Sequence, residues 1–148
     1  METVSPQEIE SRVAARYVVF LILWLSLLMS VLIFLGIVLI VGSQGTANPM
    51  LSYALLGVGL MTVIGSFLLK QQLARKAIGN YDAAALQSAH ITSLALCEAA
   101  ALFGLLDRFV TASNTSWLLF AVAIIGILLH FPRKDPLRAV SYRNIQGN

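Results

Sequence analysis

An uninterrupted apolar run near the start of the chain, residues 17–41, restricts the possible folds more than any other feature of the sequence. The run contains no charged side chain. It is long enough to form a helix across the hydrocarbon core of a bilayer, which is about 30 Å thick and needs about 20 residues. A secretory signal peptide has a shorter apolar centre, of about 7–15 residues, followed by a cleavage site. The length of the run therefore favours a membrane-spanning helix.

The rest of the chain continues the same pattern. Of the 148 residues, 58% are hydrophobic and 11% are charged, whereas about a quarter of the residues in a soluble domain are charged. Further apolar runs occupy residues 51–69, 84–106 and 117–131. These runs do not alternate with polar residues, so each is predicted to be a helix rather than a barrel strand. The short connections predict one domain, residues 1–148, folded as an all-α antiparallel bundle of four transmembrane helices.

Positive charges are distributed unevenly over the predicted loops. If the chain crosses a membrane four times, Arg108 is the only one of its ten lysines and arginines on the side opposite to the termini. The other nine lie on the side of the termini: Arg12, Arg16, Lys70, Arg75, Lys76, Arg133, Lys134, Arg138 and Arg143. Cytoplasmic loops are enriched in lysine and arginine. The count therefore predicts a plasma-membrane or inner-membrane protein with both termini, including a tail at 132–148, in the cytoplasm.

Local signals indicate where two of the helices begin or end. Ser5, Pro6 and Glu8 form a capping box, and Glu8 can pair with Arg12 one turn later. A short cytoplasmic helical segment is therefore expected to lead directly into the first span. The second helix is expected to continue beyond its apolar run through the basic residues that follow, because no stop signal occurs before Gly79.

Glu98 is the strongest candidate for a functional side chain, because it lies near the middle of the third predicted span. An ionised carboxylate at membrane depth is costly, so it needs a partner or a pocket. Glu98 either carries a proton or cation reversibly or makes a buried hydrogen bond that fixes helix packing. Gly59, Thr62 and Ser66 form a stripe of small residues on the second span that could face it. Alternatively, the two hydroxyls bond to carbonyls of their own helix.

The hairpin at residues 51–109 resembles the c-subunit (proteolipid) of rotary ATP synthases. Its segment 95–105, Ala-Leu-Cys-Glu-Ala-Ala-Ala-Leu-Phe-Gly-Leu, is similar to the family's segment around the ion-binding carboxylate, which Glu98 matches. Arg75 is a looser match to the arginine of the family's cytoplasmic loop. The resemblance implies that Glu98 carries H⁺ or Na⁺. The chain departs from the family pattern in its sparse glycine repeat, in its loop sequence, which lacks Gln-Pro or Asn-Pro after the arginine, and in its two flanking spans.

Other polar residues give weaker indications. His90 and His130 have similar predicted depths on adjacent helices, where they could ligate a haem, although interfacial histidines usually bond to headgroups or loops. Asp107 and Arg108 are interpreted as a solvated anchor at the outer end of the third span. The sequence contains no nucleophile–base pair, phosphate loop or metal-ligand spacing. No catalytic residue, metal or cofactor is therefore predicted, and nucleic acid is not an expected partner.

These observations favour a non-enzymatic function. The chain is expected to be a structural or accessory subunit of a membrane complex, in contact with lipid and with other subunits or copies of itself through faces of small residues. The alternative is a proton- or cation-translocating subunit, similar to the ATP synthase c-subunit, that uses Glu98.

Overall fold

The computed structural model of the chain has an all-helical fold, as the sequence predicts. It describes residues 6–41, 45–79, 83–111, 113–135 and 137–139, and no strand occurs within these segments. The main helices, in chain order, are α1 (Pro6–Val41), α2 (Pro49–Gly79), α3 (Ala83–Thr111) and α4 (Ser116–Leu129). The all-α fold class is therefore confirmed for the part of the chain that the structure describes.

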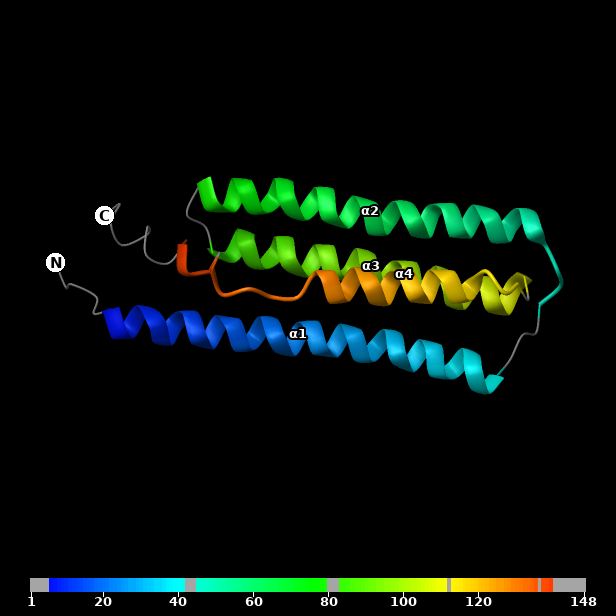
Figure 1. Ribbon diagram of the computed structural model, residues 1–148, viewed down its shortest axis with the longest axis horizontal. Helices are drawn as coiled ribbons and strands as arrows, with labels where there is room; N and C mark the ends of the chain where they lie inside the picture. The colour runs from blue at the N-terminus through cyan, green and yellow to red at the C-terminus, as the bar shows by residue number, and fades with distance from the viewer. Residues whose placement is uncertain (1–5, 42–44, 80–82, 112, 136, 140–148) are drawn as a thin grey trace.

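The helices run alternately in opposite directions (Figure 1). Helices α1 and α2 lie on opposite sides of the molecule, with α3 and α4 between them. Both outer helices contact α3 and α4, but over the described residues they do not contact each other.

The helix boundaries follow local signals in the sequence. Pro6 and Pro49 begin α1 and α2, at the position where a missing N–H removes no helical hydrogen bond. The side chain of Asn48 accepts a 3.2 Å hydrogen bond from a backbone N–H in the first turn of α2. The predicted extension of α2 through its basic segment is confirmed, because the helix ends at Gly79. The predicted capping residue Ser5 lies outside the described residues.

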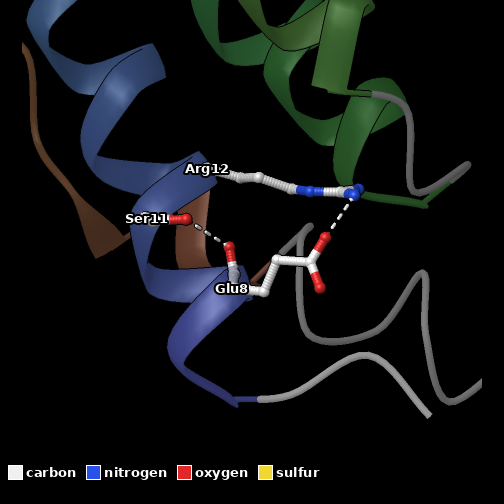
Figure 2. Close-up of polar contacts among 3 residues, drawn as sticks. All are labelled: Glu8, Ser11 and Arg12. Atoms are coloured by element: carbon white, nitrogen blue, oxygen red, sulfur yellow. Dashed lines mark hydrogen bonds and ion pairs between the residues drawn. The ribbon is translucent and has the colours of Figure 1, made fainter.

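The first turns of α1 contain the ion pair that the sequence predicts. Arg12 Nη2 lies 2.7 Å from Glu8 Oε1, and Ser11 Oγ donates a 2.8 Å hydrogen bond to the Glu8 carbonyl (Figure 2). Close by in sequence, Glu10 Oε2 lies 2.9 Å from Arg138 Nη2. The second pair joins the start of α1 to the segment that follows α4, so these two parts of the chain lie at the same end of the bundle.

Two buried clusters hold the helices together. The larger cluster takes residues from all four helices and lies around Leu94, Phe120 and Ile127, which are almost completely buried. The smaller cluster lies at the end where α1 begins and includes Val13 and Leu137. Close van der Waals packing of these apolar side chains sets the relative positions of the helices within the bundle.

Three of the helices are long and apolar enough to cross a membrane, through the segments Gln7–Val41, Pro49–Ala77 and Ala84–Thr111. Helix α4 is also apolar but has 14 residues, which extend about 21 Å at 1.5 Å per residue. It ends at Leu129 because Pro132 disfavours helical backbone in the residue before it. The first three predicted spans thus have helices of sufficient length, whereas the fourth is a shorter apolar helix.

Candidate functional sites

Glu98 lies on α3 and faces α1. Ser30 Oγ of α1 donates a 2.5 Å hydrogen bond to Glu98 Oε1 in a partly buried position. Cys97, one residue earlier, is fully buried, and its sulfur lies 3.4 Å from Ser66 Oγ of α2. Successive residues of a helix are rotated by about 100°. This rotation directs Cys97 towards α2 and Glu98 towards α1.

The predicted small-residue stripe of α2 is not brought to Glu98 in the described structure. Thr62 Oγ1 donates to the Gly59 carbonyl at 2.8 Å, and Ser66 Oγ donates to the Val63 carbonyl at 2.7 Å. These hydroxyls therefore bond to their own helix, which is the alternative that the sequence left open. Gly59 instead packs against the side chain of Leu119 on α4.

Helix α1 is joined to the rest of the bundle by a second polar contact. Trp24 Nε1 donates a 2.7 Å hydrogen bond to the carbonyl of Ile127 in the last turn of α4, which also accepts a 3.1 Å bond from the His130 N–H. Sequence reasoning did not single out Ser30 as a partner of Glu98. The sequence did contain one indication. Ser26 and Ser30 are the two serines within the apolar run at residues 17–41, and their hydroxyls can donate to a carboxylate.

The prediction that Asp107 and Arg108 form a solvated anchor is wrong for Asp107, because its side chain is fully buried. Its two carboxylate oxygens accept hydrogen bonds from Thr111 Oγ1 at 2.6 Å and Thr115 Oγ1 at 2.8 Å. Ser52 of α2 makes a short hydrogen bond with the Thr115 hydroxyl, so the network links α2, α3 and the start of α4. Arg108 turns away from Asp107 and donates weak 3.4 Å hydrogen bonds to the following loop, while its buried Nε has no partner among the described residues.

The two histidines are buried near the other end of the bundle. His130 Nδ1 forms a 2.7 Å hydrogen bond with the Gly126 carbonyl, and its ring lies 4.3 Å from that of Phe67. The His90 ring lies 5.1 Å from that of Phe20. The Nε2 atoms of both histidines lack a hydrogen-bond partner within the described residues. The rings thus pack against two different phenylalanines, and no observation favours a shared haem.

The remaining predicted site residue, Arg75, is exposed in the last turns of α2. No group of three or more His, Cys, Asp or Glu side chains able to hold a metal ion occurs in the described segments.

An open, mostly apolar groove lies along α2 and is bordered by Leu96 of α3. Its lining includes Ala54, Gly57, Val58, Met61, Thr62 and Gly65. A Cβ atom added at Gly57 or Gly65 would have no neighbour within 4 Å. These two glycines are therefore not required by packing within the chain.

The glycines inside the bundle differ from those of the groove. A Cβ atom at Gly126 would lie 2.9 Å from Cys97 Sγ, and one at Gly104 would lie 3.1 Å from Leu119 Cβ. Close helix contacts explain the absence of side chains at these positions. The bundle supplies no corresponding explanation for Gly57 and Gly65.

Comparisons of the chain with protein-family models, with curated proteins and with solved structures find no match.

Proposed function

We propose that this chain is a small multi-pass membrane protein that acts as a non-enzymatic structural or accessory subunit of a membrane complex. Its exposed apolar surface supports insertion into a membrane. In the most apolar window of α1, only 11% of the residues are buried inside the protein, and Ile40, Leu39 and Ile22 are 87%, 65% and 61% exposed. Soluble monomers rarely expose continuous apolar surface of this extent.

We propose further that the chain crosses the membrane four times, with both termini in the cytoplasm. The basic residues support this orientation, because nine of ten fall on one side of a four-span arrangement. The pairing of Arg138 with Glu10 supports an even number of crossings, because it brings the segment after α4 to the start of α1. A bilayer can thin around a short helix such as α4 at a modest cost per Å of mismatch.

The groove along α2 is the main evidence for a role as an accessory subunit. Association of helices in a membrane depends on close packing, for which small residues at the interface are favourable. Gly57 and Gly65 lie two helical turns apart, in open space along the groove. A transmembrane helix of another subunit, or of a second copy, would approach α2 closely along this groove.

The test is to fill the groove without changing the bundle. The double substitution Gly57→Ile and Gly65→Ile adds bulk where no neighbour lies within 4 Å, so the protein should remain folded. Gly36→Ile on α1 is the matched control, because Gly36 also faces open space. Recovery of cross-linked complexes from native membranes should fall about tenfold for the groove variant and remain unchanged for the control. Unchanged recovery for the groove variant would contradict the proposal.

A second function is ion translocation through Glu98, in the manner implied by the resemblance to the ATP synthase c-subunit. The observation in its favour is a partly buried carboxylate with a single hydroxyl donor, Ser30, among the described residues. Such a group can exchange a proton with little rearrangement. Glu98→Gln keeps an acceptor for the Ser30 hydroxyl but cannot ionise. Loss of transport activity in the Glu98→Gln variant, with an intact fold, would support this function. If Glu98 of the wild type does not react with a carboxylate-directed carbodiimide, that result would count against it.

A further inference from the structure

A cavity of about 290 Å³ lies at the basic end of the bundle, which we define as the end where α1 begins and α2 ends. It lies where the apolar run of α2 gives way to charged residues. The walls come from all four helices and from the segment after α4, and they include Phe20, Lys70, Leu86, His90, Phe131 and Arg133. Its volume is well above the share of one water molecule in the liquid, about 30 Å³.

Two basic residues near the cavity have partners within the chain. Lys134 Nζ lies over an aromatic ring, 4.7 Å from the centroid, and Arg138 pairs with Glu10. Lys70 and Arg133 make no hydrogen bond or ion pair with any described residue, and their like charges repel each other. Lys70 is partly buried and Arg133 is exposed. An anion between the two like charges would reduce their repulsion.

His90 is a third residue in the cavity wall that can donate a hydrogen bond to an anion. His90 is only 6% exposed and lines the cavity, yet its Nε2 atom has no partner in the described segments. Buried polar atoms are nearly always hydrogen-bonded, so an unpartnered one requires an explanation. Lysine, arginine and the N–H group of a neutral imidazole can all donate to phosphate oxygens.

The apolar walls indicate where the anion comes from. Leu129 and Phe131 both line the cavity and are 67% and 47% exposed. Exposed apolar side chains beside a basic pocket are suited to a ligand with a charged head and a hydrocarbon tail. A small soluble anion would not use them.

We propose that this cavity binds the phosphate headgroup of an anionic phospholipid. Lys70, His90 and Arg133 donate to the phosphate oxygens, while Leu129 and Phe131 contact the upper part of an acyl chain. Basic pockets between transmembrane helices are known sites for anionic headgroups. The proposal requires membrane insertion, but it does not depend on the partner interface along α2 or on the number of spans.

The experiment measures lipid binding by native mass spectrometry of the purified full-length protein in detergent. Phosphatidylglycerol should bind to the wild type, and zwitterionic phosphatidylcholine should bind at least about tenfold more weakly. Lys70→Gln and Arg133→Gln should each weaken phosphatidylglycerol binding about tenfold, through the loss of one charge-assisted hydrogen bond. Arg75→Gln is the matched control, because it removes a positive charge from the same end without touching the cavity, and its effect should remain below about twofold.

Three results would overturn the proposal: equal binding of the two lipids, equal weakening by Arg75→Gln and the cavity variants, or displacement of phosphatidylglycerol by millimolar inorganic phosphate. The last result would assign the cavity to a free anion. If Lys70→Gln does not fold, Arg133→Gln still tests the site, because Arg133 lies outside the helices. In addition, phosphatidylglycerol should protect Lys70 of the wild type from acylation by an amine reagent, and unchanged acylation would contradict the proposal.

Discussion

At one end of the bundle, Asp107 is fully buried, and each of its carboxylate oxygens accepts a hydrogen bond from a threonine hydroxyl. At the other end, His90 is buried with Nε2 unpartnered, and Lys70 and Arg133 face a cavity without a counter-ion among the described residues. Among the described residues, the Asp107 carboxylate is fully hydrogen-bonded within the chain, although Nε of the adjacent Arg108 is buried without a partner. The arrangement around the cavity is complete only with a ligand from outside.

The difference shows how buried polar groups can be divided between structure and binding. A satisfied network fixes one arrangement of the helices, and the loss of one member leaves the others without partners. An unsatisfied group lowers stability in the free protein, and this cost is recovered when a ligand binds. We therefore expect substitutions at the Asp107 end to change folding, and substitutions around the cavity to change binding.

The largest expected effect on stability comes from Asp107→Ala. The substitution removes the charged acceptor of two threonine hydroxyls. Thr111 then keeps only the carbonyl of residue 107, and Thr115 keeps only the hydroxyls of Ser52 and Ser113. The loss of two hydrogen bonds to a charged group should lower the free energy of unfolding by about 3 kcal/mol. Reversible unfolding in mixed micelles would measure the loss. Asp135→Ala is the control, because Asp135 is exposed, and it should change the free energy little. A loss below about 1 kcal/mol for Asp107→Ala would mean that the network is not structural.

A smaller effect is expected from Thr111→Val, which removes one hydroxyl and keeps the shape of the side chain. Asp107 then retains its bond from Thr115, so the loss in unfolding free energy should be about 1 kcal/mol. Thr92→Val on the same helix is the matched control. The Thr92 hydroxyl lies on an exposed face and, among the described residues, donates to the carbonyl of Ser88. If the two variants lose the same amount of unfolding free energy, the Asp107 network does not contribute more to stability than an ordinary hydroxyl–carbonyl bond on the same helix.

The smallest effect on folding is expected from His90→Phe at the opposite end. The substitution replaces an unpartnered nitrogen with an apolar ring that can still pack against Phe20. In lipid-free micelles, the unfolding free energy should therefore change by less than about 0.5 kcal/mol. Added phosphatidylglycerol should stabilise the wild type more than the variant. A loss of 2 kcal/mol or more without lipid would show that His90 is part of a complete network after all.

The sequence was sufficient to predict the parts of the fold that depend on local patterns. The apolar run at residues 17–41 forms a helix, α2 continues to Gly79, and Glu8 pairs with Arg12. The partner of Glu98 was not predictable, because α1 and α2 are apolar around most of their circumference and their sequences do not show which face is buried. The direction of Glu98 depends on its rotation about α3 and on the position of α1 opposite α2.

The burial of Asp107 and the cavity were missed for a related reason. Asp107 is adjacent to Arg108, and two neighbouring opposite charges at a helix end usually indicate solvent. The threonine that completes its network, Thr115, follows in the next loop and reaches it only in the folded chain. Lys70, His90 and Arg133 are likewise far apart in the sequence, and each alone is a common interfacial residue.

The four-span arrangement, with the Asp107 end outside and the basic end in the cytoplasm, is tested most directly by labelling cysteines from each side of the membrane. Asn114→Cys and Lys134→Cys place thiols at exposed positions before and after α4, whereas the native Cys97 is fully buried. With a membrane-impermeant maleimide, Asn114→Cys should react only from the outer side and Lys134→Cys only from the cytoplasmic side. Reaction of both from the same side would show that α4 does not cross the membrane, and would contradict the account.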